Sequence, residues 1–241
     1  MSGFLRFLAL FVVLVGFLVL VVLPLLVGPF LTQVLRDQGL RSDSLQVTVA
    51  MFDPFLVVGR SRSTHLSASD VDFSPAMVGS LELTLGDVGF FDRSWGTVSG
   101  EIRDVAVRTT TETLHVGRLA VTGPARSATA TARLSAEQTE ALIRAAAARQ
   151  GLRVDRVNFS GVGVTVTIGG LEAAARLEVR GGALVLFPGG GLNAVPLVQP
   201  APADPWQLEE AWISDSGLNI RGVVDTTALA RQVGALQLPS E

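Results

Sequence analysis

The chain has 241 residues, of which 48% are apolar and 17% are charged, and its formal net charge is −3. This apolar content is too high for a disordered protein, and the weakly acidic balance provides no basic surface for a nucleic acid. The chain contains no cysteine, which excludes disulfides, thiolate metal sites and a cysteine nucleophile. Its length suffices for one large domain after an apolar N-terminal segment.

The first predicted element is an uncharged apolar segment over residues 7–27. As a helix it would be about 30 Å long, which is the thickness of the hydrocarbon core of a bilayer. It is longer than the apolar region of a cleaved secretory signal, and no Ala-x-Ala pattern follows it around Gly28 and Pro29. The sequence therefore favours a retained transmembrane anchor in residues 1–28 over a cleaved signal, with one extracytoplasmic domain over residues 29–241.

The orientation of this signal anchor does not follow from the local charges. Arg6 is the only charged residue before the apolar segment, while Arg36 and Arg41 follow it. A short N-terminus before a first apolar segment usually stays in the cytoplasm, however, and long domains are exported regardless of charge. We therefore expect a single-pass protein of the cell membrane, with a cytoplasmic N-terminus and an extracytoplasmic, periplasmic main domain.

Beyond a short helical pattern at residues 29–38, apolar and polar residues alternate along most of the chain. Alternation of this kind is typical of half-buried β-strands, and Gly, Asp and Pro separate the segments. Gly-Gly pairs at 169–170 and 181–182 are hairpin turn signals, whereas the Gly- and Pro-rich region 188–205 predicts a loop. The predicted strands cover residues 45–51, 65–73, 79–85, 97–112, 114–121, 152–159, 162–168, 171–179, 183–187, 211–213 and 218–224.

One long helix is predicted over residues 135–150. Ser135 and Gln138 make a capping-box pattern, in which the Ser hydroxyl accepts a bond from the third backbone amide and Gln138 reaches back to the first. Gly151 is a stop signal for this helix. A second, short helix is predicted at residues 226–233, so the chain as a whole is β-rich with few helices.

The middle of the chain contains an ordered series of short motifs. Ala132-Arg133-Leu134 leads into the predicted long helix, and Leu152-Arg153-Val154 follows it. The strand at 162–168 and its Gly-Gly turn come next, and the stretch 179–188 reads VRGGALVLFP. In this order the motifs resemble the LmeA-like family of actinobacterial envelope proteins.

This resemblance implies an extracytoplasmic phospholipid-binding protein of the cell envelope, with a fold similar to the tubular lipid-binding class. In that class a long helix lies in a strongly curved antiparallel sheet, and acyl chains sit between them. The expected fold class is therefore α+β and β-rich, with an N-terminal transmembrane helix followed by a curved antiparallel sheet wrapped around one long helix. No ligand residue of the family carries over to a position in this sequence.

Patterns for catalysis or metal binding are missing from the sequence. Neither His65 nor His115 has a His, Asp or Glu at metal-ligand spacing. Ser160 lacks the glycines two residues before and after it that a hydrolase elbow requires. No Lys-Ser or Lys-Thr follows the glycines at 189–191, so they do not form a phosphate loop. We expect a protein that is not an enzyme and that has no metal and no cofactor.

Two features suit lipid binding. The long helix has an apolar stripe, and strands near it alternate aliphatic with small residues, so that an incompletely filled interior would be an apolar tunnel. The alternative is an ordinary packed core. Aromatic residues in the turn-like stretch 89–95 suit a bilayer interface or, alternatively, a plug at the end of the sheet. The candidate lipid or membrane contacts are Phe90, Phe91, Trp95, Leu142, Ile143, Ala146, Val164 and Val166.

These observations predict a membrane-anchored phospholipid-binding protein that supports envelope assembly or lipid handling. Its expected partners are a phospholipid or other acyl lipid, the membrane itself and envelope biosynthesis proteins, with no nucleic acid. One alternative is a non-enzymatic scaffold or interaction module of the envelope with a filled core. A further alternative is an enzyme acting on a lipid-linked sugar, which would require a cluster of polar side chains around a cleft.

Overall fold

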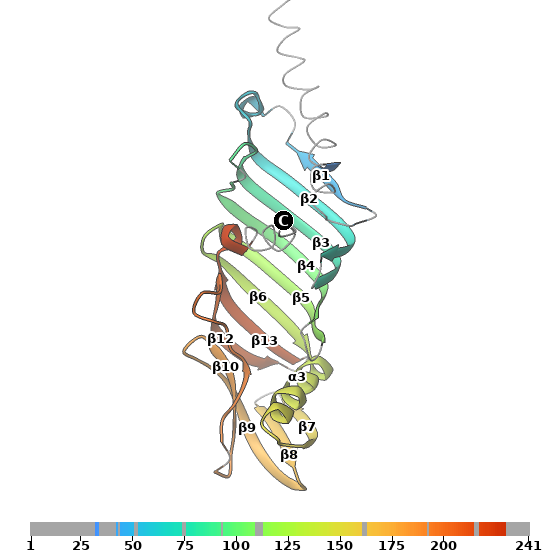
Figure 1. Cartoon of the computed structure of the whole chain (residues 1–241), viewed down its shortest axis with the longest axis vertical. Coiled ribbons are helices and arrows are strands. Elements are labelled where there is room, and N and C mark those ends of the chain that lie inside the picture. The colour runs from blue at the N-terminus through green and yellow to red at the C-terminus, as the bar shows by residue number, and fades with distance from the viewer. Residues whose placement is uncertain are drawn as a thin grey trace, which may run out of the picture.

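In the computed structural model, thirteen strands, one long α-helix and one short 3-10 helix are the principal regular elements of the described residues, and residues 226–229 are also helical. The residues that the structure describes are 32–33, 42, 44–50, 53–73, 76–92, 94–108, 113–160, 163–191, 193–214 and 217–229. The strands form two antiparallel sheets, which lie one beyond the other along the length of the molecule (Figure 1).

The large sheet has eight strands in the order β1-β2-β3-β4-β5-β6-β13-β12. Each strand pairs with its neighbours in antiparallel register, and the order follows the chain up to β6. The C-terminal hairpin then extends the sheet beside β6 (Figure 1). The strands are β1 Gln46–Val49, β2 Arg60–Phe73, β3 Ala76–Gly89, β4 Thr97–Arg108, β5 Thr113–Pro124, β6 Ala128–Ser135, β12 Trp206–Ser214 and β13 Gly217–Val224.

The small sheet has five strands in the order β11-β10-β9-β8-β7. Its edge strand β11 lies in the region 188–205 for which the sequence predicts a loop, so that prediction is wrong there. Residues of β11 pair with β10, and Pro196 is tolerated because β11 is an edge strand. The strands are β7 Val154–Ser160, β8 Gly163–Ile168, β9 Leu171–Arg180, β10 Ala183–Pro188 and β11 Val195–Val198.

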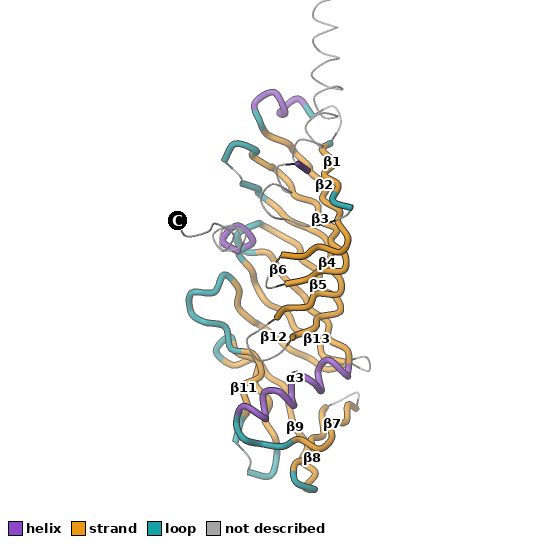
Figure 2. The backbone as a smooth tube through the Cα atoms, turned by 45° about the vertical axis from the view of Figure 1, so that its right-hand side comes forward, coloured by secondary structure: helices purple, strands orange, loops and turns teal. Residues whose placement is uncertain are grey.

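The predicted long helix is confirmed as α3, Ala136–Arg149. Ser135 is its N-cap: the Ser135 hydroxyl accepts from the Gln138 backbone amide at 3.2 Å, and the Gln138 side-chain oxygen accepts from the Ser135 amide at 2.8 Å. The helix connects β6 to β7, contacting both edge strands of the small sheet and the nearest strands of the large sheet (Figure 2). Of the predicted helix at 226–233, residues 226–229 are helical and the rest lies outside the described residues.

The β-rich character predicted for the chain is confirmed, but the predicted fold class is wrong. The strands do not form one curved sheet wrapped around one long helix. They divide into two sheets, and α3 packs at the junction of the small sheet with one end of the large sheet, leaving β2, β3 and β4 away from it. At this junction the apolar side of α3 is buried by aliphatic residues of both sheets, so the helix does not need the rest of the large sheet to cover it.

The predicted transmembrane helix at residues 7–27 lies outside the described residues. In the part of the chain that the structure describes, no helix has the length and apolar character needed to cross a membrane. The division of the chain into residues 1–28 and 29–241 therefore stays a prediction.

Three aspartates lie at bends within strands of the large sheet. Asp70, Asp87 and Asp104 have φ values of 51°, 53° and 53°, in the left-handed region that Asp tolerates better than most residues. Alternation would place Ala68 and Val71 on opposite faces of β2, yet both are buried in the same apolar cluster. The left-handed residue between them reverses the alternation, so the apolar side of the sheet continues past the bend. Figure 2 shows these strands bent rather than straight.

Candidate functional site

One face of the large sheet is apolar across every strand. Alternation places aliphatic residues or glycines at most of the inward positions, with Ser61 and Thr64 on β2 as buried polar exceptions, and the antiparallel register sets these positions side by side on neighbouring strands. One cross-strand row runs through Val47, Leu66, Leu83, Gly100, Val121, Ala130, Gly222 and Leu208. The next row runs through Ala68, Leu81, Ile102, Leu119, Ala132, Ile220 and Ala211.

This apolar face is covered unevenly. At the end formed by β6 and β13 it packs against α3, and Leu134 and Leu218 there are at most 2% exposed. Over β2 to β5 small side chains such as Ala68 and Val121 are buried within the sheet's own clusters, but the larger aliphatic side chains are only partly buried. Each of these strands therefore retains accessible aliphatic surface. The partly buried residues are Leu66, Leu81, Leu83, Leu85, Ile102 and Leu119.

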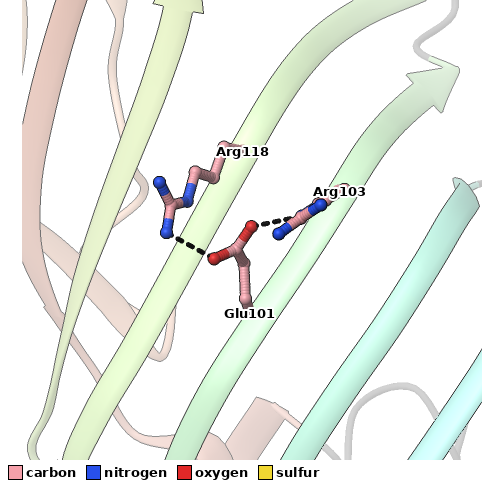
Figure 3. Close-up of polar contacts among 3 residues, drawn as sticks. All are labelled: Glu101, Arg103 and Arg118. Carbon is pink, nitrogen blue, oxygen red and sulfur yellow. Dashed lines mark hydrogen bonds and ion pairs between the residues drawn. The ribbon is translucent and has the colours of Figure 1, made fainter.

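The opposite face of the large sheet is polar and carries an ion-pair network. Arg103 on β4, Arg118 on β5 and Arg133 on β6 occupy directly opposite positions on adjacent strands. Like charges in such positions repel. Glu101 accepts hydrogen bonds from the Arg103 and Arg118 side chains and so offsets part of this repulsion (Figure 3).

The environment of Glu101 keeps it ionised. The hydrogen bond from Arg103 lowers the pKa of the Glu101 carboxyl below its ordinary value, with desolvation opposing this effect and the bond from Arg118 adding to it. The pKa of Arg103 is raised mainly by the same hydrogen bond. A carboxylate held ionised between two guanidinium groups is a poor proton acceptor at neutral pH. Through the bond from Arg118, Glu101 links β4 to β5.

His65 also lies on the polar face. Its Nδ1 is 3.3 Å from the Thr84 hydroxyl, and its Nε2 is 3.9 Å from a carboxylate oxygen of Glu82. Within the described ranges, no three His, Asp or Glu side chains gather as a metal ion would require. The expectations that the protein has no metal, no cofactor and no enzymatic activity stay predictions.

Five of the predicted lipid contacts lie together in the interior of the protein. They belong to the core between α3 and the small sheet, and each is at most 6% exposed. They pack against one another and against neighbouring aliphatic side chains. This arrangement fits the alternative interpretation, in which these residues form an ordinary packed core. These residues are Leu142, Ile143, Ala146, Val164 and Val166.

The three aromatic residues predicted to contact lipid lie in different environments in the structure. Trp95 packs against the apolar face near Val98, and its indole Nε1 donates a hydrogen bond to the Thr226 hydroxyl at 3.0 Å. Phe90 is half-buried, whereas Phe91 is 87% exposed. Trp95 thus fits the interpretation of a plug at the end of the sheet, and only Phe91 presents its ring to the surroundings.

The residues that extend the apolar face past its bends are missing from the predicted site. Asp70, Asp87 and Asp104 are each followed by a valine, at equal intervals along the chain. That repeated Asp-Val pair was the available signal. Its meaning depends on the backbone conformation of the Asp, which alternation alone does not reveal.

Comparisons with known protein families, with curated proteins and with solved structures find no match for this chain. The resemblance to the LmeA-like family therefore stays a prediction.

Proposed function

We propose that this protein binds phospholipid by holding acyl chains against the apolar face of the large sheet, over β2 to β5. The observation that carries the proposal is the set of in-register aliphatic rows on that face, whose larger side chains stay partly exposed where α3 does not reach. An acyl chain needs no polar partner on such a surface, and each methylene that it buries contributes about 0.8 kcal/mol.

The dimensions of the face suit one acyl chain. Neighbouring strands lie about 4.8 Å apart, so the path from β2 to β5 is about 14 Å long. One leaflet of a bilayer contributes about half of a 30 Å hydrocarbon core, or about 15 Å. Gly100 lies in the middle of the first row, where a Cβ would come within 2.1 Å of the Glu82 backbone oxygen, so the glycine allows β3 and β4 to pair closely at this point.

The sequence supports a location at the membrane. The apolar segment at residues 7–27 would hold the protein in the cell membrane as a single-pass protein, with its N-terminus in the cytoplasm and its main domain outside. The similarity of the central motifs to the LmeA-like family supports a role in the actinobacterial cell envelope, in envelope assembly or lipid handling alongside envelope biosynthesis proteins.

The proposal is tested with the full chain in vesicles that contain a phospholipid with a photoactivatable acyl chain. We expect cross-links on the apolar residues of β2 to β5, and Leu83→Gln should reduce them several-fold. Ser99→Gln on the polar face of β4 is the matched control and should leave them unchanged. Equal labelling of the two faces, or no effect of Leu83→Gln, would contradict the proposal.

The packed core between α3 and the small sheet favours a second candidate, a non-enzymatic scaffold of the envelope. In that case the apolar face would bind no lipid, and the protein would act through its surface. The same cross-linking experiment distinguishes the two, because a scaffold would give no acyl-chain cross-links on β2 to β5.

A further inference from the structure

A projecting tip lies at the β1 edge of the large sheet. It consists of the 3-10 helix η2, Pro54–Val58, which connects β1 to β2, and the turn 90–92 that follows β3. The Phe90 backbone amide donates to the Gly59 carbonyl at 2.9 Å and joins the two parts. The Phe91 ring lies directly over Gly59, whose φ is 71°, and a Cβ there would come within 2.0 Å of the ring.

Large apolar side chains are exposed on this tip. Phe55 is 43%, Val57 63%, Val58 61% and Phe91 87% exposed. These four are half of the large exposed apolar residues found in the described part of the chain. Their concentration on one short projection is a feature of surfaces that meet a partner or a membrane.

Two arginines lie beside the exposed apolar side chains. Arg60 and Arg62, two residues apart on β2, line an open pocket of about 320 Å³ together with Phe55, Ser61 and Asp87. The Arg62 guanidinium carbon lies 4.7 Å from the centre of the Phe55 ring. The pocket therefore combines two guanidinium groups with one carboxylate and an aromatic wall.

The backbone under the pocket is held by a buried carboxylate. Asp53 is 4% exposed and accepts hydrogen bonds from the backbone amides of Phe55, at 3.1 Å, and Arg62, at 2.6 Å. Its charge is thus directed at backbone amides rather than at the guanidinium groups. These bonds tie the start of η2 to the start of β2 and so set the backbone from which the tip projects its side chains.

We propose that this tip docks on a bilayer that contains anionic phospholipid. Phe55, Val57, Val58 and Phe91 enter the interface, and Arg60 and Arg62 bind a lipid phosphate. Guanidinium groups pair with phosphate through charge-assisted hydrogen bonds, and aromatic and aliphatic side chains beside them are typical of interfacial contacts. The first strand after the apolar segment at residues 7–27 is β1, which forms this same edge of the sheet, so the tip belongs to the part of the fold nearest in sequence to that segment.

This inference goes beyond the proposed function, because a protein can dock at a bilayer without carrying an acyl chain on its sheet. Different measurements test the proposed function and the docking of the tip, so either one can be wrong without the other. Loss of acyl cross-links on β2 to β5 would remove the proposed function, whereas the position of the tip is read from a probe on η2.

The full chain contains no cysteine, so a single cysteine can be placed and labelled at one position. Val58→Cys carries an environment-sensitive fluorophore on the tip, and Leu171→Cys, at the start of β9 and 77% exposed, carries the same fluorophore on the small sheet as the matched control. Both proteins are placed in phosphatidylcholine vesicles with a spin-labelled lipid quencher, with and without phosphatidylglycerol.

We expect several-fold stronger quenching at Val58 than at Leu171, and a further increase with phosphatidylglycerol. Arg60→Gln with Arg62→Gln should abolish that increase and leave the quenching in phosphatidylcholine unchanged. Equal quenching at the two positions would overturn the docking of the tip. If quenching at Val58 does not change with phosphatidylglycerol or with the arginine substitutions, the proposed phosphate contact is wrong.

Discussion

Apolar and polar residues alternate along the strands of both sheets, but the resulting apolar faces are covered to different extents. In the small sheet the apolar side chains meet α3 and one another, and Ile143, Val166 and Leu184 are fully buried. In the large sheet the apolar rows pass beyond the reach of α3, and residues such as Leu83 and Ile102 stay partly exposed. An alternating strand therefore shows which side chains share a face, but what covers that face depends on the elements packed against it.

The largest expected effect comes from the packed region. Ile143→Ala should lower the free energy of unfolding by about 3 kcal/mol, because it opens a cavity in a filled core. Leu83→Ala on the large sheet should cost only about 1 kcal/mol, since Leu83 is partly exposed before the substitution. Urea unfolding of the full chain in micelles, followed by circular dichroism, measures both. Equal costs would show that the two faces are equally well covered.

The bends of the large sheet should give the next effect. Asp104→Val places a β-branched residue in the left-handed region and should cost about 1–2 kcal/mol, whereas Asp104→Gly should be close to neutral. The same unfolding measurement applies. If the valine variant were as stable as the glycine variant, the left-handed conformation at Asp104 would not be required for the continuous apolar face.

The junction between the sheets depends on the start of α3. Ser135→Ala removes the side-chain acceptor for the Gln138 amide and should cost about 1 kcal/mol. Ser135→Asp keeps an acceptor at the N-cap and should restore most of the loss. Failure of the aspartate variant to restore stability would show that the loss does not arise from capping.

The smallest expected effect is a pH dependence on the polar face of the large sheet. Hydrogen bonds from Arg103 and then Arg118 lower the pKa of Glu101, so its contribution to stability is present above its ordinary pKa of 4.5 and is lost as the pH falls through the lowered value.

Glu101→Gln should therefore unfold at lower urea than the natural chain at neutral pH, and the gap should close under strong acid. Glu172→Gln, an exposed carboxylate on β9, is the control and should show little difference at either pH. A gap for Glu101→Gln that persists in strong acid would contradict the ion-pair explanation.

The helix and most strands could be predicted from local signals. The capping box of Ser135 and Gln138 predicted α3 because both hydrogen bonds form within one turn. The Gly-Gly pair at 169–170 predicted the hairpin of β8 and β9, which is also a local feature. Both glycines have positive φ values, as the tight turn requires. The strand β11 was missed because its pairing with β10 crosses a Gly- and Pro-rich stretch whose composition indicates a loop.

The predicted lipid contacts stay a prediction, and the structure shows only where their residues lie. Alternation predicted aliphatic faces suited to acyl chains, but it located them at Val164, Val166 and the stripe of α3, which the fold buries in a filled core. The accessible face lies on β2 to β5 instead. Exposure is set by contacts between segments far apart in the chain, which no local pattern contains.

By itself, the sequence determined the β-rich character of the chain, the position and cap of its long helix, and the uncharged N-terminal segment, because these depend on neighbouring residues alone. Only the tertiary structure decided that the strands divide into two sheets and that the C-terminal hairpin pairs with β6. It also decided that the apolar face stays partly exposed away from α3. The physical reason is that strand pairing and burial arise between distant segments, so residues with the same pattern become a core in one sheet and an accessible surface in the other.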